Sequence, residues 1–193
     1  MKSIVVFCGA STGSDPVYRE AAAALGRVLA GQQVKLIYGG GNVGLMGVIA
    51  DAVLGEGGEV VGVIPDFLKR WEVAHNGLTE LVVTETMHER KALMAQMADG
   101  FITLPGGFGS MDELFEILTW KQLQIHRKPV GLLNINGFYD PLLGMMDRMV
   151  EAGFLKESNR ELLLVSGDAE DLLSQMLDHQ PVVAEKWVDR QKI

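Results

Sequence analysis

Cysteine is nearly absent from this sequence, which has a single one, Cys8, among its 193 residues. One cysteine cannot form a disulfide within the chain, and it cannot by itself supply a cysteine-rich metal site. Cys8 also ends the first apolar run of the chain. The lack of cysteine fits a reducing compartment, and we expect a cytoplasmic protein.

Clusters of positive charge are also missing. The chain has 17 Lys and Arg residues against 25 Asp and Glu residues, which gives a formal net charge of -8. Nucleic acids and anionic membranes bind proteins through clustered cations. The charge balance therefore argues against both classes of partner.

Long unbroken apolar segments and a targeting pattern at the N-terminus are absent as well. The first residues lead directly into a strand-like run, and no segment has the apolar length of a membrane-spanning helix. We therefore expect neither a secretory signal nor a membrane span.

The sequence does contain a regular alternation of apolar, β-branched runs with helical patterns. The expected strands cover residues 4–8, 34–38, 60–64, 81–84, 101–104, 130–133 and 163–165. The expected helices cover residues 16–30, 44–54, 88–98, 110–122, 141–152 and 169–177. Because the strand runs lack polar alternation, they are predicted to be buried on both faces. The pattern predicts an α/β fold, a Rossmann-like, doubly wound parallel sheet with helices on both faces.

One domain is expected from the length and composition. A chain with 48% hydrophobic residues can bury one sizeable core. We assign residues 1–180 to a single Rossmann-like domain, and residues 181–193, which are charged and without a clear period, to a C-terminal extension.

A glycine-rich turn at residues 105–113 reads Pro-Gly-Gly-Phe-Gly-Ser-Met-Asp-Glu and joins an expected strand to an expected helix. Glycines let the backbone approach a ligand, and the free N–H groups of a helix N-terminus attract an anion. The turn predicts a phosphate site made by Gly106, Gly107, Phe108, Gly109 and Ser110. A carboxylate such as Glu113 would repel the phosphate and is free to act on the group that carries it.

Glu113 also has a structural interpretation. Ser110 followed three residues later by Glu113 is the pattern of a capping box. The segment 87–91 favours the functional interpretation, because Arg90 has a planar fork suited to phosphate or carboxylate. If the two helix starts are neighbours, Arg90 can hold Glu113 or the ligand.

A second glycine-rich turn, at residues 38–44, contains a formal G-x-G-x-x-G pattern. The pattern is typical of dinucleotide sites, but the next strand ends in Pro65-Asp66, and the proline disturbs the position of the acid that such sites need. The glycines also fit a tight turn with close packing of helix and sheet. In a parallel sheet this turn, residues 9–11 and residues 105–113 would meet at the carboxyl edge of the strands.

These segments, in this order, resemble the LONELY GUY family of cytokinin-activating phosphoribohydrolases, whose members were once labelled lysine decarboxylases. The resemblance runs from residue 7 to about residue 154, with Ser110 where the family usually has threonine and Asp112 where it often has glutamate. It implies hydrolysis of the N-glycosidic bond of a nucleoside 5′-monophosphate to a free base and ribose 5-phosphate. It also implies a homodimer, and neither a cofactor nor a metal is expected.

The resemblance assigns roles to individual residues. Arg90 and Glu113 match the catalytic pair, and the ligand-contacting positions match Glu72, Lys91, Gly107 to Ser110 and Thr119. We add Gly106 from the first turn and Gly40 and Gly41 from the second as substrate-binding candidates. A fixed carboxylate can stabilise an oxocarbenium-like sugar and orient or deprotonate the attacking water, which is the role expected of Glu113. Arg90 would orient Glu113 and keep it ionised, or balance the charge of the ligand.

Several alternatives stay open at this point. The old family label suggests a pyridoxal-phosphate decarboxylase with Lys91 as the Schiff base. A general purine nucleotide nucleosidase of salvage and a nucleotide-binding protein without catalysis are two more, and the base can be adenine or an N6-prenylated adenine. For the homodimer, the physical hint is an excess of apolar helical residues at 43–50 and 117–120.

Overall fold

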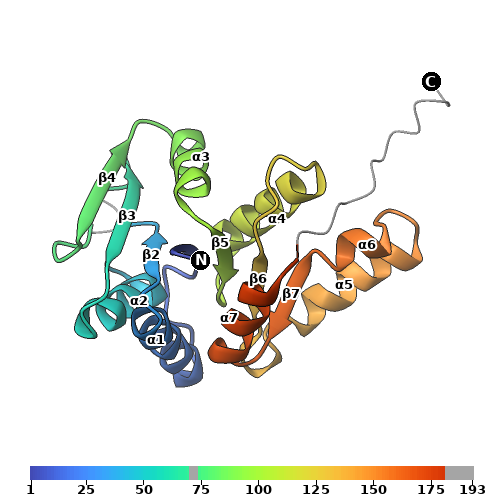
Figure 1. The fold of residues 1–193 in the computed structure, drawn as a ribbon, viewed down its shortest axis with the longest axis horizontal. Helices are drawn as coiled ribbons and strands as arrows, with labels where there is room; N and C mark the ends of the chain where they lie inside the picture. The colour runs from blue at the N-terminus through green and yellow to red at the C-terminus, as the bar shows by residue number, and fades with distance from the viewer. Residues whose placement is uncertain (70–73, 181–193) are drawn as a thin grey trace.

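The computed structural model describes residues 1–69 and 74–180. The predicted contact Glu72 and the predicted extension 181–193 lie outside the described residues. Within the described part, seven parallel strands form one sheet in the order β4-β3-β2-β1-β5-β6-β7 (Figure 1). The strands are β1 Ser3–Phe7, β2 Lys35–Tyr38, β3 Val60–Pro65, β4 Glu80–Thr84, β5 Gly100–Thr103, β6 Val130–Leu133 and β7 Leu163–Ser166.

Helices cover both faces of this sheet, as the sequence predicted. They are α1 Pro16–Gly31, α2 Gly44–Gly55, α3 Met87–Met97, α4 Phe108–Gln122, α5 Asp140–Glu151, α6 Glu157–Arg160 and α7 Ala169–Asp178, with a 3-10 turn η1 Ile135–Gly137. Helices α1, α2 and α7 pack on one face and α3, α4 and α5 on the other. None of the described helices combines the length and the apolar character needed to span a bilayer.

The central strands are apolar because their residues are shared between two cores. In β1, Ile4 and Val6 belong to the core under α1, α2 and α7, whereas Val5 and Phe7 belong to the core under α3, α4 and α5. All four side chains are buried. A strand buried on both faces cannot carry polar alternation, so the uninterrupted apolar runs correctly predicted the architecture.

The sheet reverses its strand order at β1, and this reversal positions the loops of interest. β1 pairs with β2 on one side and with β5 on the other. The connection from β4 to β5 runs through α3, which therefore crosses back over the sheet (Figure 1). Ligands of open α/β sheets bind at such a switch point, outside the carboxyl ends of the strands.

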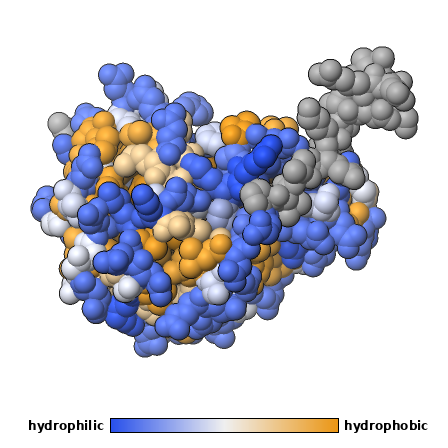
Figure 2. Space-filling model, in the orientation of Figure 1, coloured by the Kyte–Doolittle hydropathy of each residue, from blue (hydrophilic) through white to orange (hydrophobic). Residues whose placement is uncertain are grey.

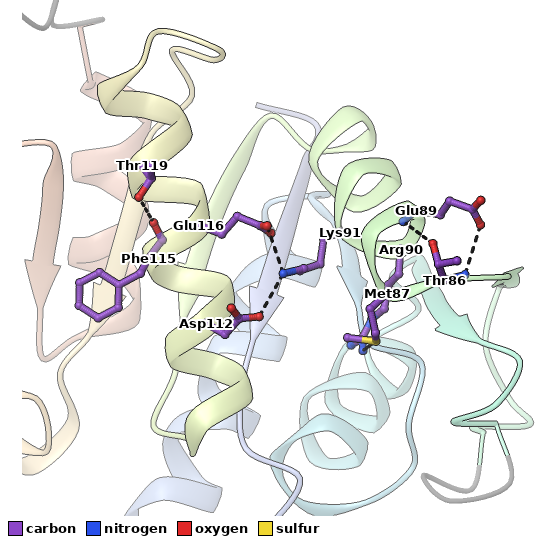
Figure 3. A network of polar contacts seen from close by, with 9 residues as sticks. All are labelled: Thr86, Met87, Glu89, Arg90, Lys91, Asp112, Phe115, Glu116 and Thr119. Carbon is purple, nitrogen blue, oxygen red and sulfur yellow. Dashed lines mark hydrogen bonds and ion pairs between the residues drawn. The ribbon is translucent and has the colours of Figure 1, made fainter.

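The starts of α3 and α4 differ from the prediction. A capping box does occur, but at α3, where Thr86 accepts from the Glu89 N–H and Glu89 accepts from the Thr86 N–H (Figure 3). Helix α4 begins at Phe108 with Gly107 as its N-cap. The predicted capping box of Ser110 and Glu113 is wrong, because the helix starts two residues earlier and its first turn carries no acidic residue.

The physical hint for a dimer is also wrong. The apolar residues of segments 43–50 and 117–120 are largely buried within one chain, including Leu45, Ile49 and Ile117. They pack on the sheet in the two cores. The exposed apolar side chains of this region are others, namely Phe108, Phe115, Leu123 and Ile125. Figure 2 shows one face of the molecule, on which hydrophobic patches lie between hydrophilic residues.

Candidate active site

Three loops meet at the carboxyl edge of β1, β2 and β5, as expected from the sequence. The Gly9 N–H donates to the Pro105 carbonyl at 3.1 Å, and the Leu45 N–H donates to the Gly9 carbonyl at 3.0 Å. Beside these loops lies a cavity of about 260 Å³. It is lined by Val6 to Ala10, Gly39, Met46, Leu68, Met87, Arg90, Gly107, Gly109, Ser110, Asp112 and Glu113.

Arg90 and Glu113 face each other in this cavity, one from α3 and the other from α4. Arg90 Nη2 lies 3.6 Å from Glu113 Oε1, and both side chains are nearly buried, with exposed fractions of 7% and 11%. Arg90 Nε has no hydrogen-bond partner among the described residues. The structure thus brings together the two residues that the sequence singled out, as a buried ion pair at the wall of a cavity.

Gly39 makes room for the guanidinium of Arg90. A Cβ at this position would meet Arg90 Nη2 and the sulfur of Met46. Of the glycines in the second turn, Gly39 lines the cavity, whereas Gly40 and Gly41 do not. The Gly40 carbonyl instead accepts from the His75 N–H at 3.0 Å, and Gly41 pairs with Ala74 in an isolated bridge. The predicted substrate residues Gly40 and Gly41 therefore do not line this cavity.

The N-terminus of α4 points its first N–H groups at the same cavity. No side chain among the described residues caps this end, because the N-cap is Gly107. Ser110 is buried, and a Cβ on Gly106 would clash with its hydroxyl. Gly107, Gly109 and Ser110 line the cavity, whereas Phe108 turns its ring to solvent, with 97% of the residue exposed. An uncapped helix N-terminus beside a cavity is a site for an anionic ligand group.

A second cavity of about 430 Å³ lies on the other side of the same loops. It shares Gly9, Ala10 and Gly107 with the first cavity and adds the aromatic rings of Tyr18 and Phe138. These rings pack edge to face with their centroids 5.7 Å apart. Glu113 and Arg90 do not line this second cavity.

Lys91, next to Arg90 on α3, points toward α4 (Figure 3). Its Nζ lies 3.1 Å from Asp112 Oδ2 and 3.1 Å from Glu116 Oε1. Burial alone would lower the pKa of Lys91, but the hydrogen bonds to the two carboxylates outweigh burial, and the pKa is raised. Lys91 is therefore a charged ammonium held by two acids.

Thr119 lies apart from the cavity. Its hydroxyl donates to the Phe115 carbonyl at 2.7 Å, one turn back along α4 (Figure 3). It lines a shallow hollow of about 330 Å³ with Met111, Asp112, Phe115, Glu116 and Trp120. Within one chain the structure does not bring Thr119 to Arg90 and Glu113.

Two groups of residues in the site were missed by the sequence reasoning. Leu68 and Met87 line the cavity, and neither was given a role, although Met87 opens the segment 87–91. Asp112 and Glu116 hold Lys91, and here a signal existed, because carboxylates four residues apart lie on one face of a helix. Cys8 also lines the cavity, where burial, reinforced by the charge of Glu113, raises the pKa of its thiol. Since the thiolate is the reactive form, Cys8 is not suited to act as a nucleophile.

Known proteins resemble the chain in sequence and in fold. Residues 46–176 match a family model described as possible lysine decarboxylase. The cytokinin riboside 5′-monophosphate phosphoribohydrolase LOG7 of Arabidopsis thaliana is 46% identical over 93% of this chain and 83% of its own length. The probable cytokinin riboside 5′-monophosphate phosphoribohydrolase LOGL2 of Oryza sativa subsp. japonica is 42% identical over 99% of this chain and 78% of its own length.

Solved structures extend the likeness in fold alone. A molybdenum cofactor binding protein from Rippkaea orientalis has a TM-score of 0.68 at 20% identity, covering 92% of this chain and 96% of its own. The molybdenum cofactor carrier protein of Chlamydomonas reinhardtii gives a TM-score of 0.68 at 20% identity, covering 92% of this chain and 99% of its own. At this identity the likeness carries the Rossmann-like fold and not the ligand.

Proposed function

The chain belongs to the LOG family of cytokinin riboside 5′-monophosphate phosphoribohydrolases, and from this premise we propose how its cavity performs the hydrolysis. The substrate is a nucleoside 5′-monophosphate, and the products are the free base and ribose 5-phosphate. The observation that carries the proposal is the buried pair of Arg90 and Glu113 beside an uncapped helix N-terminus.

Glu113 acts on the sugar. When the bond between C1′ and the base nitrogen breaks, its electron pair leaves with the base, and positive charge develops on the ribose. A carboxylate held at a cavity wall stabilises that charge and accepts the proton of the attacking water as the new C1′–oxygen bond forms. The leaving base takes up a proton to complete the balance.

Arg90 orients Glu113. Its guanidinium is nearly buried and lies 3.6 Å from the carboxylate, so its positive charge holds Glu113 at the wall of the cavity. The positive charge of Arg90 also balances the negative charge brought by the substrate.

The substrate phosphate binds at the start of α4. Gly107, Gly109 and Ser110 line the cavity there, and the phosphate oxygens accept hydrogen bonds from the first N–H groups of the helix. Glu113 lies in the second turn of the same helix. The helix thus holds the phosphate at its end and presents the carboxylate to the ribose farther along.

The names of the relatives point to N6-substituted adenosine monophosphates, the cytokinin riboside 5′-monophosphates, as substrates. Plain AMP, as in a salvage nucleosidase, is the alternative. A pyridoxal-phosphate decarboxylase is disfavoured by Lys91, because a Schiff-base lysine must lose its proton and two carboxylates hold this one charged.

The test is release of base, measured by chromatography after incubation with AMP, with isopentenyladenosine 5′-monophosphate and with adenosine. We expect free base from the monophosphates, and a kcat/KM for adenosine lower by on the order of 10²-fold, because the nucleoside lacks the charge-assisted hydrogen bonds of the phosphate. Equal kcat/KM for AMP and adenosine would refute the phosphate site. Tight binding of AMP without any released base would identify a nucleotide carrier instead.

We also propose that the protein is a cytoplasmic homodimer. Phe108, Phe115, Leu123 and Ile125, on α4 and just after it, are exposed apolar side chains that a second copy would cover. The isolated chain leaves Thr119 away from the catalytic pair, and a role in substrate contact would be explained if the hollow beside Thr119 faced the partner. Light scattering at micromolar concentration tests the dimer, and a monomer mass would refute it.

A further inference from the structure

A second set of ion pairs joins α3 to α4 directly beside the catalytic pair. Lys91 follows Arg90 on α3, and Asp112 precedes Glu113 on α4. Lys91 Nζ contacts Asp112 Oδ2 and Glu116 Oε1 at 3.1 Å each (Figure 3). The ion pair of Arg90 and Glu113 is longer, at 3.6 Å. The closer contacts between the two helices are therefore the ones without an assigned role in the chemistry.

The two helices lie side by side on the same face of the sheet. Helix α3 contacts each of β1 to β4, and α4 contacts β1. Apolar side chains such as Met94 and Leu114 hold each helix down on the sheet. The polar side chains that reach across help to set the sideways spacing of α3 and α4, and of these Arg90 leaves its Nε without a hydrogen-bond partner among the described residues.

The carboxylates on α4 need the positive charge of Lys91 for their compensation. Asp112, Glu113 and Glu116 place three carboxylates on one stretch of α4, against the two cations Arg90 and Lys91 on α3. Oε2 of Glu116 is buried and has no hydrogen-bond partner in the described part of the chain, so this carboxylate relies on Lys91 for its compensation. Removing Lys91 would leave like charges facing α3, and removing the acids would leave a cation that competes for Glu113.

We propose that Asp112 and Glu116 are positioning residues for the hydrolysis, which they serve by holding Lys91 and thereby fixing α3 at the distance that sets Arg90 against Glu113. The inference rests on the proposed function, because it assigns these two residues a part in that reaction. It adds a structural role to Lys91 beside its predicted contact with the substrate.

Kinetics of variants with AMP test the role. In Asp112→Asn and Glu116→Gln together, we expect kcat to fall on the order of 10-fold with KM changed less than about 3-fold, because misplacing reacting groups affects the transition state while the phosphate is held elsewhere. Asp112→Glu keeps the carboxylate and is expected to retain parental kcat, a rescue that a general packing defect would not show. A parental kcat in the double variant, or a change confined to KM, overturns the proposal.

A matched control comes from α5 and α6. Asp147 pairs with Arg160 at 2.8 Å, with a half-exposed carboxylate and a more buried cation, as in the pair of Asp112 and Lys91. Asp147→Asn breaks a comparable ion pair between two helices far from the cavity. Its kcat is expected to equal that of the parent, and a fall as large as in the double variant would show that any lost ion pair has this effect.

Adding Lys91→Met separates positioning from direct substrate binding. If the three residues act as a unit, Lys91→Met costs little further kcat once both acids have been neutralised, because effects within one network are not additive. Fully additive losses would overturn the proposal.

A crystal structure of the double variant provides a readout that does not require activity. The proposal expects the separation of Arg90 and Glu113 to differ from that in a crystal structure of the parent protein, and an unchanged separation refutes it. If the parent releases no base from any monophosphate, the proposed function fails, whereas this comparison of spacing still decides the inference.

Discussion

The two ends of α4 are built in opposite ways. At the C-terminal end the chain satisfies its own polar groups: the Ile125 N–H donates to the Trp120 carbonyl at 2.9 Å. His126 accepts from the Lys128 N–H through Nδ1, so its Nε2 carries the proton that is donated to the Ile117 carbonyl at 3.0 Å. At the N-terminal end Gly107 offers no side-chain cap, and a cavity lies beside the first turn.

A buried cation accompanies each end. Lys121, near the C-terminal end, is buried and donates to the Leu162 carbonyl at 3.0 Å, with His179 Nε2 at 3.3 Å. Arg90, beside the N-terminal end, is equally buried but faces a carboxylate at 3.6 Å and a cavity. Burial of a charge therefore does not identify a functional group, whereas an incomplete set of partners beside a cavity does.

The largest effect is expected from Glu113→Gln, which tests the functional role of the N-terminal end of α4. The neutral amide cannot act as a base and gives little support to a positive sugar, so kcat for base release should fall by on the order of 10²-fold or more. Because the N-cap of α4 is Gly107, the substitution removes no cap, but it leaves the nearly buried Arg90 without its charged partner, so the melting temperature should fall while the protein still folds. Near-parental base release by a folded Glu113→Gln protein would remove Glu113 from the mechanism.

Gly106→Ala tests the shape of the N-terminal end. A Cβ here would clash with the Ser110 hydroxyl and would lie 3.0 Å from the Gly9 nitrogen, so the glycine-rich turn at residues 105–113 must shift. We expect kcat/KM for AMP to fall about 10-fold, since lost alignment costs transition-state binding.

Gly144→Ala is the matched control for Gly106→Ala. Gly144 is an exposed glycine of α5, and a Cβ at this position meets nothing within 4 Å. The substitution should leave kcat/KM unchanged and raise the free energy of unfolding by up to about 1 kcal/mol, because alanine is the better helix residue. If Gly106→Ala keeps parental kcat/KM, the tight fit at this loop is not needed for phosphate binding.

Lys121→Met tests the other end of α4 and should affect stability alone. The variant leaves the Leu162 carbonyl without its donor, which costs about 1–3 kcal/mol in the free energy of unfolding by urea denaturation. The kcat of the folded fraction should equal that of the parent. A large loss of kcat at unchanged stability would contradict the structural role of this end.

The same variant carries a pH dependence of known sign. Burial lowers the pKa of Lys121 to about 8, from 10.5 in an exposed lysine. Between these values the unfolded chain holds a proton that the folded chain has released, so the contribution of Lys121 to stability rises with pH across this window. The stability difference between the parent and Lys121→Met should therefore be larger at about pH 9.5 than at about pH 7.5. A constant difference would show that Lys121 has an ordinary pKa.

Sequence reasoning found the elements of this fold because strands buried on both faces and helices with apolar periods leave local signals. It also singled out Arg90 and Glu113 through the family resemblance, but only on the condition that the two helix starts are neighbours, which the structure shows to be the case. It placed the start of α4 too late, because Ser110 and Glu113 have the spacing of a capping box. In the structure the helix has already begun at Phe108, and Ser110 packs against Gly106.

The bridge through Lys91 could not be predicted in the same way. The four-residue spacing of Asp112 and Glu116 shows a shared helix face, but which residue that face meets depends on how α3 crosses the sheet. The dimer hint failed for a related reason. The sequence reasoning expected apolar residues outside a single buried helix face to be exposed on the surface. In the structure α2 packs against α1 as well as against the sheet, so more than one face of this helix is buried.

The reversal of strand order at β1 has a consequence for the newborn chain. Ile4 of β1 pairs with Gly100 of β5, so one edge of β1 stays open until β5 has left the ribosome. An open strand edge can pair with other chains, and a nascent chain stopped before β5 is expected to aggregate. Arg90 is likewise synthesised before Glu113, so the ion pair of Arg90 and Glu113 forms only after β5, the second neighbour of β1, has been made. The covering of the open β1 edge and the formation of the pair of Arg90 and Glu113 thus occur at about the same stage of synthesis.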